Sequence, residues 1–293
     1  MRLTEFFDRG EFVVTAEVGP PKGFHIEHLV EEANEFLKGR VHAVNVTDNQ
    51  SSVMRLGSLA TCKVLKDNGL NTIFQVTCRD RNRIALQSDI LSAALLGIDN
   101  LLLLTGDHTT LGDHPQAKPV FDLDSVSLTH AVKRMEEGFD IAGNAIDGEF
   151  PKFSKGAVVS PCSDSVDAQL AKMEQKVKAG VEYFQTQGVY EPEKFIKFMD
   201  KAKQFGVPVQ LGIIIPKNVG MVRYMNANVA GVHVPDDMIE ELKADKEKTK
   251  AGITGVEISA RIIKECKDYC QGVHIMALGW ESKIPAILDQ AGL

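Results

Sequence analysis

The chain has 293 residues, of which 44% are hydrophobic and 25% are charged, with a formal net charge of −7; this composition is typical of a globular protein with a substantial core. No cluster of Lys and Arg is long enough for a nucleic-acid arm or a lipid-binding patch, so nucleic acid is not an expected partner. No run approaches the roughly 18 apolar residues of a membrane helix, and the N-terminus lacks the apolar region of a signal peptide, so we expect a cytoplasmic protein without a membrane partner.

Short apolar runs alternate with segments of helical periodicity through the first half of the chain. The first run, 13–18, is stopped by Gly19-Pro20-Pro21, because proline has no N–H to donate to a strand ladder. Further strands are predicted at 42–47, 72–77 and 100–105. Helices are predicted at about 26–37, 56–69, 83–96 and 125–137, and Asp124 is the expected N-cap of the last one.

The second half repeats this alternation. Strands are predicted at 157–160, 183–187, 209–215 and 273–278, and helices at about 166–179, 192–205, 217–227 and 235–271, followed by a closing helix. Eight strands alternating with helices in just under 300 residues predict a single (β/α)8 TIM barrel over residues 1–293. A doubly wound open sheet is the alternative. It is disfavoured because no strand is followed by GxGxxG or by GxxxxGK[ST].

Two irregular stretches, 107–123 and 139–156, are longer than ordinary connections in a compact domain. The first follows a strand and should lie over the active face, whereas the second precedes a strand and should serve packing or assembly on the opposite face. Five scattered cysteines predict reduced thiols. Cys266 and Cys270, four residues apart, could supply two metal ligands, but a structural zinc site needs four, so no metal is predicted.

Glu17 is the one charged residue of the first predicted strand, and it lies near the carboxyl end of that strand. In a parallel barrel this end faces the active site. Apolar neighbours would disfavour the ionised form of the carboxyl, which could then act as a general acid. The alternative is a structural ion pair with a Lys or Arg.

Hydroxyl and amide side chains follow most of the other strands. They occur within 47–49, 77–80, 105–107, 160–161, 186–187 and 216–218. The region after the last strand lacks the glycine-rich cradle that barrels use for a phosphate group. Such a ring of donors and acceptors suits a large neutral heteroaromatic ligand, such as a flavin or a pterin.

Six motifs at these strand ends, in order and at family-like intervals, resemble those of the methylenetetrahydrofolate reductases. They are TAEVGPP at 15–21, VTDN at 46–49, VTCRDRN at 76–82, LTGD at 104–107, KPVFD at 118–122 and TQ at 186–187. The resemblance covers about residues 3 to 290 and leaves no part of the chain for the C-terminal regulatory domain of larger members. It implies a flavoprotein, usually with FAD although FMN is possible, that functions in one-carbon metabolism and methionine biosynthesis.

In this family 5,10-methylenetetrahydrofolate is reduced to 5-methyltetrahydrofolate by a reversible, ping-pong hydride transfer through flavin N5. By resemblance, Glu17 corresponds to the catalytic glutamate that protonates the methylene bridge. Asp107 corresponds to the aspartate that lies near the flavin and meets the pterin, and Gln187 to a substrate-binding glutamine. The flavin contacts correspond to Thr47, Gln75, Thr77, Thr105, Gly106, Asp107, Phe121, Ser160 and Lys176.

Several of these residues have structural alternatives. The threonines are β-branched and favoured in strands, and Gly106 could simply form a turn. Lys176 could be a surface charge, Asp107 a helix cap, and Gln187 an amide satisfied by backbone. The chain also departs from the family where Gln75 replaces a common His, Thr105 a common Arg, and Gly279-Trp280 an Asn-Arg pair.

The departures leave the electron donor open between NADH, NADPH and a partner electron-transfer subunit, and we expect an oligomer. One alternative function is a flavin-bearing subunit that takes its electrons only from such a partner. Another is a flavin-free barrel lyase or aldolase that uses Glu17 and Asp107 as an acid and base pair.

Overall fold

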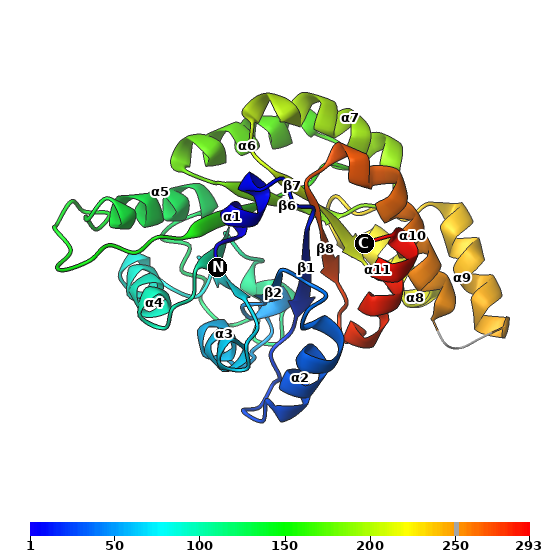
Figure 1. Ribbon diagram of the computed structural model, residues 1–293, viewed down its shortest axis with the longest axis horizontal. Coiled ribbons are helices and arrows are strands. Elements are labelled where there is room, and N and C mark those ends of the chain that lie inside the picture. Colours follow the sequence, from blue (N-terminus) through cyan, green and yellow to red (C-terminus); the bar gives the residue numbers. More distant parts are fainter. Residues whose placement is uncertain (249–251) are drawn as a thin grey trace.

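A computed structural model describes residues 1–248 and 252–293, in which eight parallel strands form a closed barrel. Each strand pairs with the next along the chain, and β8 (Gly272–Met276) closes the barrel against β1 (Val13–Val18). Figure 1 shows the helices arranged around the strands. The predicted (β/α)8 TIM barrel is therefore confirmed.

The remaining strands are β2 (Ala43–Val46), β3 (Thr72–Thr77), β4 (Asn100–Leu104), β5 (Ser154–Val159), β6 (Tyr183–Gly188) and β7 (Val209–Ile214). The α-helices are α1 (Leu3–Asp8), α2 (Glu27–Glu32), α3 (Ser58–Asp67), α4 (Arg83–Leu95), α5 (Ser125–Glu136), α6 (Val166–Ala179), α7 (Pro192–Ala202), α8 (Val219–Asn228), α9 (Asp236–Lys248), α10 (Ile253–Cys266) and α11 (Ile284–Ala291). Short 3-10 helices include η2 (Gln50–Ser52) and η3 (Thr109–Leu111), and α2 continues into a π-helical turn, η1 (Ala33–Leu37).

The helical stretch predicted over 235–271 consists of two helices, α9 and α10. Gly252 precedes α10 with a φ of +71°, a left-handed conformation that cannot continue a helix. The part of the prediction that falls on 249–251 lies outside the described residues. Strand β5 begins three residues before its predicted start, because Ser154 already pairs with Asn100 of β4.

The predicted N-cap of α5 is confirmed. The Asp124 carboxylate accepts a 2.8 Å hydrogen bond from the backbone N–H of Ser127, whose hydroxyl in turn accepts from the N–H of Asp124. This reciprocal pair is a capping box, and it satisfies backbone donors that the first helical turn leaves free.

The amino end of the barrel is closed by α1, a helix that the sequence analysis did not predict. Figure 1 shows α1 over the barrel opening. Leu3 is fully buried in a cluster with Val13, Ala43, Ile73, Leu102 and Tyr183. These strand residues point into the barrel because alternate residues of each strand do so. The cluster forms an apolar plug, a name used below for these residues together with α1.

A layer of polar side chains lies above the plug, inside the barrel. Thr15 Oγ1 lies 3.0 Å from His274 Nδ1, the Asn45 amide donates to Gln185 Oε1 at 2.7 Å, and Gln185 donates to Gln210 Oε1 at 3.1 Å. All five side chains are almost fully buried. Each side chain finds a partner on another strand, either the adjacent one or one across the barrel interior, so the set forms a hydrogen-bonded floor, which we call the amide layer.

The two long loops lie on the two predicted faces. The loop 107–123 follows β4 and packs tightly on the loop after β2, where a Cβ added to Gly112 would come within 1.7 Å of the Ser52 carbonyl oxygen. The predicted loop 139–156 runs into β5, whose first residue, Ser154, has its hydroxyl 2.9 Å from Thr4 Oγ1 of α1. The first loop therefore borders the site described below, while a role of the second in assembly stays a prediction.

All five cysteines are buried free thiols. Burial raises the pKa of Cys270 to about 11, and its thiol lies 3.5 Å from the carbonyl oxygen of Cys266. Within the described ranges, no helix is both long and apolar enough to cross a membrane.

Candidate active site

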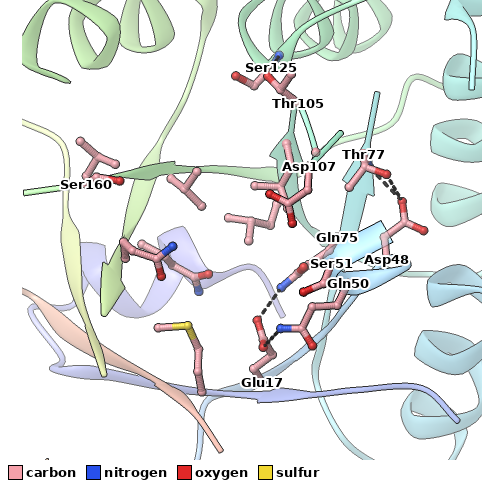
Figure 2. Close-up of a pocket in the computed structure, with 18 of the residues that line it drawn as sticks. Glu17, Asp48, Gln50, Ser51, Gln75, Thr77, Thr105, Asp107, Ser125 and Ser160 are labelled. Carbon is pink, nitrogen blue, oxygen red and sulfur yellow. Dashed lines mark hydrogen bonds between the residues drawn. The ribbon is translucent and has the colours of Figure 1, made fainter. Parts of the chain in front are cut away.

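A cavity of about 370 Å³ opens at the carboxyl ends of the strands, above the amide layer (Figure 2). All the predicted site residues except Thr47 and Phe121 line it. These are Glu17, Gln75, Thr77, Thr105, Gly106, Asp107, Ser160, Lys176 and Gln187. They come from strands β1, β3 and β6, from the loops that follow β4 and β5, and from helix α6. Residues far apart in the sequence thus meet in one place.

The two exceptions have clear positions. Thr47 is only 1% exposed and its hydroxyl has no hydrogen-bond partner in the described structure, while its backbone N–H donates to the Val18 carbonyl oxygen at 3.2 Å. Phe121 has a left-handed φ of +41°, and its ring stacks with that of His108 at a centroid distance of 6.2 Å. Neither side chain belongs to the cavity lining.

Glu17 is 8% exposed and is held by two amides. The Gln50 side chain donates to Oε1 at 2.9 Å and the Gln75 side chain donates to Oε2 at 3.3 Å, as the dashed lines in Figure 2 show. His274 Nε2 lies 3.8 Å from Oε2. The alternative of an ion pair fails, because no Lys or Arg in the described ranges lies within salt-bridge distance.

The expectation of apolar surroundings for Glu17 is wrong. Val14, Ala16 and Val18 do belong to the apolar core outside the barrel. The Glu17 side chain points the other way, into the interior, because successive strand residues face opposite sides. Its surroundings are therefore set by side chains of other strands and of the loops, and not by its neighbours along its own strand.

Gln50 was missed by the sequence analysis. It begins the 3-10 turn η2. Asn49, just before this turn, and Ser51 and Ser52 within it have positive φ values of 45°, 54° and 58°. Each such conformation in a residue other than glycine costs on the order of 1–3 kcal/mol, and strain of this kind gathers at functional sites. Nothing in the residue types at 51 and 52 signals it, so no sequence pattern could have identified this turn.

Arg79 is the second residue that was missed, although its motif was recognised. Its side chain is 2% exposed and forms a salt bridge with Asp80 at 2.8 Å. It also donates to the carbonyl oxygens of Asn49 at 3.1 Å and Asp107 at 3.4 Å. Burial opposes its charge, but the hydrogen bond and attraction of Asp80 prevail and raise the pKa of Arg79. One buried cation thus ties together the loops after β2, β3 and β4.

Thr77 and Thr105 both support neighbouring elements. The Thr77 N–H and hydroxyl donate to one oxygen of Asp48, at 2.9 and 2.8 Å, and Arg81 pairs with the same carboxylate at 2.6 Å. Thr105 Oγ1 accepts from the N–H of Ser125 at 3.1 Å, at the start of α5. Their occurrence at strand ends thus has structural reasons, and both also line the cavity.

Gly106 lies where a larger residue would not fit. Its φ is +93°, and an added Cβ would stand 3.1 Å from Thr77 Cβ and 3.2 Å from Arg79 Cβ. The next residue, Asp107, is exposed and lines the cavity, and it caps no helix. Across the cavity, Gln187 Oε1 accepts from the N–H of Gly188 at 3.0 Å, as the structural alternative supposed, although the residue still lines the cavity.

Lys176 is buried and is therefore not the surface charge of the alternative interpretation. Its ammonium group donates to the Val158 carbonyl oxygen at 2.7 Å. Burial, helped by the charge of Lys172, lowers the pKa of Lys176 to about 8. The cavity therefore contains a cation that can lose its proton under mildly alkaline conditions.

A second cavity of about 440 Å³ adjoins the first, and Glu17 and Gln50 line both. Its other lining residues include Arg55, Leu278 and Glu281. Glu281 is 6% exposed, its Oε2 has no hydrogen-bond partner in the described structure, and burial raises its pKa. Glu17 and Gln50 therefore stand in the wall between two spaces.

The sequence comparisons with known proteins agree on one family. A family model described as methylenetetrahydrofolate reductase matches residues 2–292. "Methylenetetrahydrofolate reductase 2" of Schizosaccharomyces pombe is 27% identical over 235 residues, which cover 74% of this chain and 35% of the relative. The 5,10-methylenetetrahydrofolate reductase of Pectobacterium carotovorum is 25% identical over 263 residues, covering 87% of this chain and 82% of the relative. The chain thus spans about a third of the yeast relative and most of the bacterial one.

Among solved structures, an uncharacterized protein from Clostridium thermocellum is described as binding two copies of 5-methyl-5,6,7,8-tetrahydrofolic acid. It aligns with a TM-score of 0.70 and 15% identity, over 99% of this chain and 98% of that one. At this identity the likeness demonstrates a shared fold alone.

Proposed function

Because the chain belongs to the methylenetetrahydrofolate reductase family, an oxidoreductase family, we propose that it interconverts 5,10-methylenetetrahydrofolate and 5-methyltetrahydrofolate through a bound flavin. The observation that carries this proposal is Glu17, held by two amides at the wall of a cavity that also contains Asp107 and Gln187. The C. thermocellum protein of the same fold is described as binding 5-methyltetrahydrofolic acid, which supports a reduced folate as the ligand.

The main cavity suits a flavin. Its apolar lining residues, which include Leu102, Leu104 and Met276, offer contact area to a flat ring system, and its hydroxyls and amides match the polar ring edge. A residue with a Cβ at position 106 would crowd Thr77 and Arg79, so the glycine keeps this side of the cavity open. The residues proposed to hold the group are Gln75, Thr77, Thr105, Gly106, Asp107, Ser160 and Lys176. Since FAD and FMN share the ring, both are compatible, and FAD is the family's usual form.

A bound flavin would supply reversible hydride transfer. The protein supplies the proton and the charges. Glu17 would hold a proton and deliver it to a nitrogen of the folate methylene bridge, where its two amide contacts fix the direction of the carboxyl. The Asp107 carboxylate would stabilise positive charge that develops on the folate. Gln187 would bind and orient the substrate.

The experiment that tests this function is an anaerobic absorbance titration of the purified chain. Bands of flavin that bleach with 5-methyltetrahydrofolate are the expected result. Bleaching by NADH or NADPH would identify the electron donor, and bleaching by the folate but by neither nucleotide would point to a partner subunit. If the chain bound no flavin even after reconstitution, the proposal would be wrong and the lyase alternative, with Glu17 and Asp107 as acid and base, would take its place.

A further inference from the structure

We propose that Gln50 is a positioning residue of this reaction, which holds the Glu17 carboxyl in the wall between the two cavities. The inference rests on the proposed function, because it concerns the proton that Glu17 would deliver. It concerns a residue outside the six motifs that carry the family resemblance, since the second motif ends at Asn49.

The first argument is geometric. The 2.9 Å bond from Gln50 to Glu17 Oε1 is the shorter of the two amide contacts, and Gln75 supplies the other at 3.3 Å. Gln75 projects from strand β3, whereas Gln50 comes from the turn η2, so the two hydrogen bonds to the carboxyl come from different elements. With both in place, the nearly buried side chain has little freedom to rotate away from the cavities.

The second argument concerns protonation. Each carboxyl oxygen has two acceptor positions, so an oxygen that accepts from an amide can still carry a proton on its other side. Glu17 could therefore release its proton to a substrate nitrogen and take one up again while both amides stay bonded. An amide carries no net charge, so it favours a carboxylate less strongly than a Lys or Arg in the same place would.

The third argument is that the turn carrying Gln50 is strained and is held in place by several partners. Asn49 Oδ1 accepts from the N–H of Arg55 at 3.0 Å, and Arg79 donates to the carbonyl oxygen of Asn49. Gly112 packs directly on the Ser52 backbone. Three consecutive loops thus maintain a conformation that the residues of the turn would not adopt alone. Because the turn is held in this conformation, the Gln50 side chain points at Glu17.

The test replaces Gln50 with an isosteric side chain that cannot donate a hydrogen bond, Gln50→Met. With the flavin-loaded chain, we expect the rate constant for flavin bleaching at saturating 5-methyltetrahydrofolate to fall about 10-fold to 100-fold. The concentration of folate that gives half the maximal rate should change by less than about threefold, because positioning acts on the transition state more than on binding. Reduction of the flavin by dithionite should be unchanged.

Gln75→Met is the matched comparison. It removes the longer bond to Glu17 and also a proposed flavin contact, so it should weaken flavin binding, whereas Gln50→Met should not. A second readout does not need the flavin. Trp280 is the single tryptophan and lies between Gly279 and Glu281, which line the second cavity. Its fluorescence should give the same affinity for 5-methyltetrahydrofolate in the flavin-free wild-type chain and in the flavin-free Gln50→Met chain.

The inference would be overturned by a Gln50→Met chain that bleaches at the wild-type rate, or by one whose rate falls only as much as its folate binding. Either result leaves the proposed function standing, provided that the wild-type chain itself is bleached by 5-methyltetrahydrofolate. If the wild-type chain is not bleached, the proposed function fails, and the inference fails with it.

Discussion

The two ends of the barrel carry side chains of opposite character. At the amino end, Leu3 fills the opening against Val13 of β1 and Ile73 of β3. At the carboxyl end, Glu17 and Gln75 of the same two strands line an open cavity. Residues of one strand can therefore serve either stability or chemistry. Which of the two a residue serves depends on how far along the strand it lies. Stability is concentrated in the apolar plug and chemistry in the cavity, as the barrel architecture allows.

The largest effect expected at the carboxyl end is that of Glu17→Gln. Flavin bleaching by 5-methyltetrahydrofolate should slow by about 100-fold to 10,000-fold, the range that a general acid contributes. Flavin content, reduction by the electron donor and the thermal midpoint should stay close to wild type, because the amide keeps the shape of the carboxyl. Stopped-flow absorbance measures the rate of bleaching, and calorimetry measures the thermal midpoint. Unchanged folate turnover would refute the assignment of Glu17.

The converse is expected of Leu3→Ala in the apolar plug. Removing this fully buried side chain should lower the free energy of unfolding by about 2–5 kcal/mol, while the rate per folded molecule stays the same. Urea unfolding measures the loss. Leu95→Ala is the control, since Leu95 is 87% exposed and its removal should change stability by less than about 0.5 kcal/mol. Equal losses in both variants would contradict the plug.

A smaller effect, of about 10-fold, is expected on flavin affinity from Lys176→Met, the size of one charge-assisted hydrogen bond. Because the pKa of Lys176 is lowered to about 8, the wild-type chain should bind flavin more weakly as the pH rises through 8, and the variant should lack this dependence.

The stability of the flavin-free chain should depend on pH in the opposite direction. Burial disfavours the charged lysine, so the free energy of unfolding of the wild type should rise between pH 8 and the ordinary lysine pKa of about 10.4. Flavin fluorescence quenching measures the flavin affinity, and urea unfolding measures the stability. Flavin affinity that is independent of pH in the wild type would contradict the placement of Lys176 at the flavin.

The smallest effect, about 1 kcal/mol of stability, is expected of Asp124→Ala, which removes the N-cap of α5. Although burial raises the pKa of Asp124, the hydrogen bonds from Ser127 prevail and lower it. The contribution should therefore be present above the ordinary Asp pKa of about 3.9 and be lost as the pH falls below it. Asp124→Asn keeps the acceptor and should retain the stability without the pH dependence. Urea unfolding at several pH values measures the stability of each variant. A loss of stability in Asp124→Asn equal to that in Asp124→Ala would contradict a capping role.

The barrel and most of its site could be predicted from sequence because both depend on local signals. Apolar runs of strand length give the eight strands, and the residues that stop them lie at one end of the barrel by geometry. Thus Glu17, Asp107 and Gln187 could be placed at one site before any contact was known. The family resemblance added their roles.

What could not be predicted depends on which strand positions lie side by side. Thr15, Asn45 and Gln185 are unremarkable in their own strands, and only the register of the barrel joins them into the amide layer. The helix α1 has six residues and no clear periodicity, so no local sequence signal predicts it. Gln50 depends on left-handed residues at 51 and 52, and serine carries no preference for that conformation.

The shared wall of the two cavities has a consequence for inhibitor chemistry. Two small fragments, one in each cavity, would lie on either side of Glu17 and Gln50. A short linker that supplied its own N–H to Glu17 could take the place of the Gln50 amide and join them. The second fragment would then bind at a high effective concentration, so the linked compound could exceed the affinity of either fragment by about 100-fold or more.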